Sequence, residues 1–98
     1  MNLGKAIKTL RKQKGFSQEE LATSSKITQA ALSQIENGKR PGSSTLKKIS
    51  AALKIPESLI YVAGLEKGDV AEEKQILYEQ LFPVIESLVT QLASDRTH

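Results

Sequence analysis

Apolar residues recur at three- and four-residue intervals along most of the chain, and this helical period limits the fold more than any other feature of the sequence. Leu3, Ala6, Ile7 and Leu10 form the first such stripe. No stretch alternates apolar and polar residues strictly enough to predict a β-strand. We therefore expect an all-α fold.

Start and stop signals predict several short helices in the first part of the chain. Gly15, a residue that readily adopts the left-handed conformation, is expected to end the first helix. Ser17 and Glu20 have the spacing of a capping box, in which a hydroxyl and a carboxylate each satisfy an unpaired backbone N–H group. Thr28 is expected to cap a third helix, which stops at Gly38.

Two further helices are expected after a basic loop at residues 39–42. Ser43 or Ser44 is expected to cap the fourth helix, because a hydroxyl can accept a hydrogen bond from a free N–H group of the first turn. Pro56 suits the first position of the fifth helix. Five short helices with apolar faces make one compact unit, which we expect to span residues 1–64.

The rest of the chain is predicted to be a linker at residues 65–69 and a helical segment at residues 70–98. Asp69 and Glu72 have the spacing of a second helix cap. A helical pattern then runs over residues 70–93, and its apolar residues fill one broad face. This part of the chain therefore needs a surface to cover it.

Two questions about the segment 70–93 stay open: whether it is one helix or two, and which surface it covers. Pro83 cannot donate a backbone hydrogen bond, so the segment is either one kinked helix or two helices. It is our candidate dimerisation element, or it folds back onto the core of its own domain, and both can hold together. The residues expected at the dimer interface are Leu77, Leu81, Ile85, Leu88 and Leu92.

Charge is distributed unevenly along the chain, whose net charge is +3. Residues 1–54 contain eleven basic and three acidic side chains, a balance of +8. Residues 55–98 contain three basic and eight acidic side chains, a balance of −5. Such asymmetry indicates that the first part faces nucleic acid and the second part faces something else. The alternative is that both are simply solvated surfaces.

Composition argues against several classes of site. The chain has no cysteine and a single histidine, His98, so we expect no disulfide, no thiolate and no histidine-based catalytic or metal site. We expect no cofactor and no enzymatic activity, because the paired carboxylates Glu19-Glu20 and Glu72-Glu73 lie at predicted helix starts, where capping explains them. No apolar run approaches the roughly 18 residues of a membrane span, and the cytoplasm is the simplest compartment.

Three consecutive segments have the lengths of a helix, a tight turn and a second helix, namely residues 18–24, 25–27 and 28–37. This order is the helix-turn-helix arrangement. The outward positions of the second helix are Gln29, Ala30, Ser33 and Gln34. Glutamine can pair with N6 and N7 of adenine in the major groove, whereas alanine and serine leave room or touch a thymine methyl group. The alternative is a polar face that is only solvated, but the basic residues just beyond it favour DNA.

The run FSQEELATSSKITQAALSQIENGKRPGSSTLKKISAAL resembles the Xre or lambda-repressor-like family of bacterial and phage DNA-binding domains. The opening LGKAIKTLRKQKG resembles the first helix of that family. The resemblance covers about residues 3–64. It implies a five-helix DNA-binding domain, here with a C-terminal helical extension.

The resemblance also implies a role for each matching residue. Gln18 matches a position that binds a DNA phosphate and braces the first residue of the third helix. The base-facing positions are matched by Gln29, Ala30, Ser33 and Gln34. The positions that contact the DNA backbone are matched by Thr28, Asn37, Lys39 and Arg40. Arg11 and Glu36 match an internal ion pair, so we interpret Arg11 as a structural residue.

Two departures from the family pattern stand out. Lys26 occupies the turn position where the family usually has glycine. A non-glycine residue in the left-handed conformation costs about 1–2 kcal/mol, so this turn is expected to be shifted or slightly strained. The basic loop after Asn37 is also short, which leaves the reach of Arg40 open.

We therefore expect a sequence-specific regulator that binds double-stranded DNA, reads the major groove with helix 28–37 and represses transcription. One such domain buries little surface, so a homodimer through residues 70–93 on an inverted-repeat operator is expected. The chain is too short for a separate ligand-sensing domain. The alternative is an antitoxin-type or adaptor protein whose C-terminal helix binds a partner protein.

Overall fold

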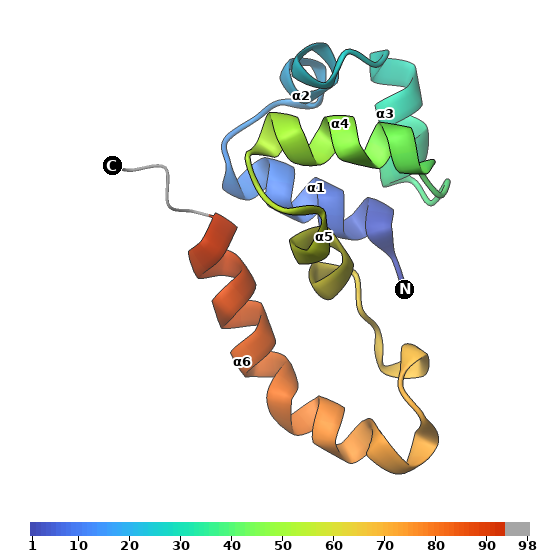
Figure 1. Ribbon diagram of the computed structural model, residues 1–98, viewed down its shortest axis with the longest axis vertical. Coiled ribbons are helices and arrows are strands. Elements are labelled where there is room, and N and C mark those ends of the chain that lie inside the picture. Colours follow the sequence, from blue (N-terminus) through green and yellow to red (C-terminus); the bar gives the residue numbers. More distant parts are fainter. Residues whose placement is uncertain (94–98) are drawn as a thin grey trace.

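The structure of the chain, a computed structural model, describes residues 1–93, which contain helices and no strand (Figure 1). The α-helices are α1 (Leu3–Gln13), α2 (Gln18–Ser25), α3 (Gln29–Glu36), α4 (Ser43–Leu53), α5 (Glu57–Ala63) and α6 (Gln75–Ala93). Two short 3₁₀-helices, η1 (Lys67–Asp69) and η2 (Glu72–Lys74), precede α6. The all-α expectation is confirmed, while the end of the predicted segment 70–98, with His98, lies outside the described residues.

Helices α1 to α5 share one apolar core. The first stripe that the sequence predicts, at Leu3, Ala6, Ile7 and Leu10, is at most 4% exposed. The large side chains that it meets in the core are Leu21, Leu32, Leu46, Ile49, Leu53 and Ile60. Burying one such side chain contributes about 1.5–3 kcal/mol. This burial stabilises helices of seven to eleven residues, which are marginal on their own in water.

The expected capping residues are present at the starts of α2 and α3, and the expected glycine follows the end of α1. Ser17 and Glu20 form the expected capping box. The hydroxyl of Thr28 accepts a hydrogen bond of 3.0 Å from the backbone N–H of Ala31. Gly15 has a φ of 81°, in the left-handed region where glycine avoids a steric penalty. The starts of α2 and α3 therefore follow from the sequence.

The starts of α4 and α5 differ from expectation by one residue. Gly42, with extended backbone, is the N-cap of α4 and supplies no side-chain hydrogen bond, while Ser43 is already the first helical residue. Residues 42–44 are exposed, so water can satisfy the N–H groups of the first turn. Pro56 is likewise the N-cap of α5 rather than its first residue.

Lys26 adopts the left-handed conformation at the end of α2, with φ 59° and ψ 40°. Its N–H bonds to the carbonyl of Thr23, and the N–H of Ile27 bonds to the carbonyl of Ala22. These two bonds form a Schellman motif, and Ile27 packs against the core. The turn is therefore not shifted, and a lysine sits in the conformation that favours glycine.

The predicted cap of Asp69 and Glu72 does not start the long helix. The carboxylate of Asp69 instead accepts from the N-terminal amine at 2.8 Å and from the N–H of Glu66 at 2.8 Å. These bonds lower the pKa of the Asp69 carboxyl, the amine having the larger effect. Two 3₁₀-helices occupy residues 67–74, and α6 begins only at Gln75.

Helix α6 is one continuous helix that contains Pro83. Proline leaves the carbonyl four residues earlier, that of Glu79, without its helical partner. Residues 79–84 are exposed, so water can bond this carbonyl and the helix does not break. No helix among residues 1–93 is both long enough and apolar enough to cross a membrane.

Helix α6 packs against α1 and α5 along one edge of its apolar face (Figure 1). Val89 and Ala93 are 6% and 0% exposed, and Ile85 is half-buried against the same core. Ile85, one of the residues predicted at the dimer interface, thus contacts its own domain, in agreement with the alternative in which the segment folds back. Its part in a dimer stays a prediction. The rest of the face, which we name the open stripe, consists of Leu77, Leu81, Val84, Leu88 and Leu92, each 45–61% exposed.

Candidate functional site

Helices α2 and α3 and the turn between them form the expected helix-turn-helix unit. Leu21 and Ala22 from α2 and Leu32 and Ile35 from α3 are all buried in the common core. Ala22 is enclosed where the two helices meet, a place that leaves little room for a larger side chain. The two helices are therefore held rigidly against the rest of the domain.

The outward face of α3 carries the four residues expected to face bases. Gln29, Ala30 and Gln34 are exposed, whereas Ser33 is half-buried. Three of the four positions are thus open to a ligand along one helix face, and Ser33 lies at its edge. No large apolar side chain interrupts this face, which leaves room for close approach to a flat surface such as the floor of a DNA groove.

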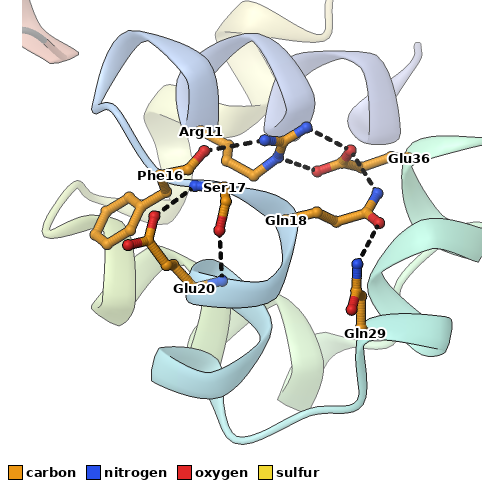
Figure 2. Close-up of polar contacts among 7 residues, drawn as sticks. All are labelled: Arg11, Phe16, Ser17, Gln18, Glu20, Gln29 and Glu36. Atoms are coloured by element: carbon orange, nitrogen blue, oxygen red, sulfur yellow. Dashed lines mark hydrogen bonds and ion pairs between the residues drawn. The ribbon is translucent and has the colours of Figure 1, made fainter.

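A hydrogen bond joins the first residue of α3 to the first residue of α2. Nε2 of Gln29 donates to Oε1 of Gln18 over 3.4 Å, and Figure 2 shows the two amides end to end. Nε2 of Gln18 in turn donates to Oε1 of Glu36 over 3.1 Å. Gln18 is half-buried between these partners. The amide of Gln29 is therefore held from behind while its outer edge stays exposed.

The Arg11–Glu36 pair is present and anchors this chain of amides. Nε of Arg11 donates to Oε2 of Glu36 over 2.7 Å, and Nη2 donates to Oε1 over 3.0 Å (Figure 2). Nη1 of Arg11 donates to the carbonyl of Phe16 over 3.0 Å. The side chains of Arg11 and Glu36 are 9% and 3% exposed. Each nitrogen of the Arg11 guanidinium thus donates to a group of its own domain, and the side chain is buried, in keeping with a structural role.

The residues expected to contact the DNA backbone lie at the two ends of α3. Thr28 is exposed at its start, although its hydroxyl already caps the helix. Asn37, Lys39 and Arg40 follow its end and are exposed. Within residues 1–93 neither Lys39 nor Arg40 pairs with a carboxylate. Their charges are therefore available to an anion.

Backbone contacts also hold the basic loop in place. The N–H of Lys39 bonds to the carbonyl of Gln34 over 2.9 Å, and the N–H of Gly38 bonds to the carbonyl of Ile35 over 3.0 Å. Gly38 has a φ of 121°, a conformation that L side chains rarely adopt. The loop therefore turns sharply at Gly38 and stays bound to the last turn of α3, which limits the reach of Arg40.

Sequence reasoning missed two contacts that position this face. The first is the bond from Gln18 to Glu36, which links the buried ion pair to the exposed amide of Gln29. No local spacing could reveal it, because the two residues are 18 positions apart. The second is at Gly4, where a Cβ atom would lie 1.9 Å from the carbonyl oxygen of Ile35. A glycine inside a helical stripe was the available signal, since it often marks close packing.

Side chains that bind metal ions are not clustered in the part of the chain that the structure describes. Residues 1–93 contain no cluster of three or more histidine, cysteine, aspartate or glutamate side chains that could hold a metal ion. The arrangement around α3 offers instead an exposed amide-bearing helix face flanked by the exposed cations Lys39 and Arg40. Such a face can make hydrogen bonds to base edges and ionic contacts to phosphates.

Comparison with known proteins points to the same unit. A model of the helix-turn-helix family matches residues 7–60. The chain is 44% identical over 66 residues, 64% of its length, to the HTH-type transcriptional repressor RghR of Bacillus subtilis (strain 168). It is 33% identical over 93 residues, 90% of its length, to the uncharacterized HTH-type transcriptional regulator RghRB of the same organism. These matches span 49% of RghR and 67% of RghRB, and no solved structure matches the chain.

Proposed function

Since the chain belongs to the helix-turn-helix family of DNA-binding transcriptional regulators, we propose that it is a dimeric repressor that reads the major groove with α3. The names of the two relatives described above, a transcriptional repressor and a transcriptional regulator, support this proposal. The observation that carries it is the amide of Gln29, which is braced from behind by Gln18 and open on its outer edge. A transcriptional regulator works where its DNA lies. We therefore propose that the protein acts in the cytoplasm.

Base reading is assigned to the exposed face of α3. When Gln18 accepts one N–H of Gln29, the other N–H and Oε1 of Gln29 stay available. One donor and one acceptor on the same edge match N7 and N6 of adenine. Gln34 offers the same chemistry further along the helix, while Ala30 and Ser33 allow a close approach.

Phosphate binding is assigned to both ends of α3. Lys39 and Arg40 supply positive charge that no carboxylate among residues 1–93 neutralises. Gln18 sits at the N-terminus of α2, where free N–H groups favour an anion. Contacts to phosphates fix register and orientation but carry no base information. Thr28 and Asn37 complete the set of proposed backbone contacts.

Dimerisation is assigned to the open stripe of α6. A single module buries too little surface for tight specific binding, so two copies on an inverted repeat are expected. Five large apolar side chains at 45–61% exposure, aligned on one helix face, form a surface that a second α6 could cover. Ile85 and Val89 hold the other edge of α6 on its own domain.

The same stripe supports a second candidate, an antitoxin-type or adaptor protein whose α6 binds another protein. Helix α6 and the turns before it carry exposed acidic residues, among them Glu72, Glu73 and Glu86. A basic partner with an apolar groove would suit this surface. Purification of the chain with a stoichiometric partner protein would favour this second candidate.

The proposal is tested by selecting bound duplexes from a random DNA pool at roughly physiological salt. The expected result is an enriched inverted repeat whose half-site centres lie about one helical turn apart, which is about 10 base pairs. Binding without enrichment would contradict base reading and leave only sequence-independent attraction to phosphates. Enrichment of a single half-site would contradict the dimer but not the role of α3.

A further inference from the structure

The dipeptide Asn37-Gly38, directly after α3, has the composition of a site of spontaneous chemical modification. Asparagine is one of the chemically labile residues of proteins. A glycine after it lacks the Cβ atom that otherwise hinders attack by the next backbone nitrogen on the side-chain amide. The chain has two asparagines, and the other one, Asn2, is followed by the bulky Leu3. Such a reaction should therefore concentrate at Asn37.

The side-chain amide of Asn37 is accessible and unengaged. Asn37 is exposed, and no group among residues 1–93 holds its side chain in a hydrogen bond. A Cβ atom on Gly38 would meet nothing within 4 Å, so no neighbouring group crowds this position. By contrast, the side chain of Asn2 caps α1 and accepts a hydrogen bond of 2.9 Å from the N–H of Lys5. Packing thus leaves room for attack at Asn37.

The folded loop nevertheless keeps the reacting atoms apart. A ring can close only when the Gly38 nitrogen eclipses the side chain of Asn37, but at a ψ of 11° it nearly eclipses the backbone nitrogen of Asn37. The N–H of Gly38 also donates to the carbonyl of Ile35 over 3.0 Å. The N–H of Lys39 donates to the carbonyl of Gln34 over 2.9 Å. Both bonds must break before the peptide can rotate, so reaction at Asn37 requires the basic loop to leave the end of α3.

We propose that Asn37 deamidates when the basic loop opens, and that bound DNA protects it by holding the loop closed. The backbone nitrogen of Gly38 loses its proton to the solvent and bonds to Cγ of Asn37. The Cγ–Nδ2 bond breaks, ammonia leaves, and a five-membered succinimide ring remains. Water then opens the ring at either carbonyl carbon, which gives aspartate or its β-linked isomer, isoaspartate. In sum, an amide and water become a carboxylate and an ammonium ion, with no change of oxidation state.

The products change the proposed phosphate-binding site in two ways. A carboxylate replaces a neutral amide at the C-terminal end of α3, where the helix dipole disfavours negative charge and where phosphates are expected. Isoaspartate also lengthens the backbone by one carbon just before Gly38, which displaces Lys39 and Arg40. DNA affinity should therefore fall about fivefold or more. This loss rests on the proposed function, whereas the deamidation itself does not.

The test is mass spectrometry of the full chain during incubation in warm, mildly alkaline buffer without DNA. Trypsin releases residues 27–39 as one peptide, whose fragment ions separate conversion at Asn37 from conversion at its glutamines. We expect aspartate and isoaspartate forms to accumulate at Asn37 while Asn2 stays intact. The folded loop should slow the reaction about 5- to 150-fold relative to a synthetic peptide of residues 27–39, the factor that two backbone hydrogen bonds allow. A chain that converts no faster at Asn37 than at Asn2, or as fast as the peptide, would overturn the proposal.

A second incubation contains random-sequence duplex at low salt, because contacts to phosphates form whatever the base sequence. Bound duplex should slow the conversion at Asn37 about fivefold or more, and high salt, which releases the duplex, should restore the rate of the free chain. An unchanged rate on bound duplex would overturn the protection by DNA. Failure to bind any duplex would contradict both this protection and the proposed function, but not the deamidation.

Asn37→Gln is the matched control, because glutamine keeps the amide but would have to close a less favourable six-membered ring. Its DNA affinity, whatever the starting value, should stay constant over an incubation in which the unchanged chain loses affinity. Asn37→Asp should bind DNA as weakly as the aspartate form of the aged chain. Thermal unfolding of each variant checks that it folds. Equal losses of affinity in the unchanged chain and in Asn37→Gln would show that deamidation of Asn37 is not their cause.

Discussion

Arg11 and Glu36 form a bidentate ion pair between α1 and α3, with Nε of Arg11 2.7 Å from one carboxylate oxygen and Nη2 3.0 Å from the other. The carboxylate also accepts from Gln18. A pair that fixes two helices to each other thus also orients the amide behind Gln29. The carboxylate of Glu36 therefore contributes both to the stability of the fold and to the proposed base reading.

Removing one partner of this pair should destabilise the fold. Glu36→Gln leaves a buried guanidinium without its counter-charge, and we expect a loss of about 3–5 kcal/mol in the free energy of unfolding. Urea unfolding followed by circular dichroism measures it. The double variant Arg11→Met with Glu36→Met, which buries no charge, should lose much less. Equal stability of Glu36→Gln and the unchanged chain would show that the pair is not structural.

Gln29→Ala and Arg40→Ala should affect DNA binding in different ways. Loss of the Gln29 amide should cost about 1–3 kcal/mol on the selected site and relax one base position. Loss of the Arg40 charge should weaken binding to all sequences and lower the salt slope by about one. Binding titrations at several salt concentrations on specific and random duplexes measure both. If the two variants behave alike, the division into base reader and phosphate clamp is wrong.

Gly4→Ala should destabilise the domain although alanine favours helices. The new Cβ would lie 1.9 Å from the carbonyl oxygen of Ile35, so α1 or the end of α3 must move. We expect a loss of about 1–3 kcal/mol, measured by urea unfolding. Gly68→Ala is the matched control, because its Cβ meets nothing within 4 Å. A stabilised Gly4→Ala variant would mean that the helices separate easily.

Lys26→Gly should stabilise the chain by about 1 kcal/mol, because glycine adopts a φ of 59° without the penalty of a Cβ atom. Lys26→Ala removes the charge but keeps the Cβ, and should bring no comparable gain. Thermal unfolding of the two variants at equal concentration separates the conformational effect from the charge effect. An equal gain in stability in both variants would show that the charge of Lys26, and not its backbone conformation, destabilises the chain.

Substitutions on the two edges of α6 should have separable effects. Leu81→Ser, on the open stripe, should shift the chain from dimer to monomer in sedimentation equilibrium because it removes apolar contact area. Val89→Ser places a hydroxyl at a position that is 6% exposed and should lower the free energy of unfolding of the monomer. A chain that is monomeric without any substitution would refute the proposed dimer.

Short-range signals predicted the helix-turn-helix unit well because its boundaries depend on nearby residues. The capping box of Ser17 and Glu20, the cap at Thr28 and the turn at Gly15 all act over about one helical turn. The same reasoning failed at Asp69, whose carboxylate bonds to the N-terminal amine from the far end of the chain. A cap signature is reliable only when no distant partner competes for the side chain.

The sequence by itself determined an all-α chain, the helices that carry Gln18 and Gln29, and the basic residues that follow α3, since helical period and capping are local properties. Only the tertiary structure decided which part of the broad apolar face of α6 is covered and that Glu36 supports the Gln18 amide behind Gln29. Docking buries Val89 and leaves the open stripe exposed, a choice that depends on the shape of α1 and α5. The support of Gln29 depends on Glu36, which reaches Gln18 only once α1, α2 and α3 have packed around a common core.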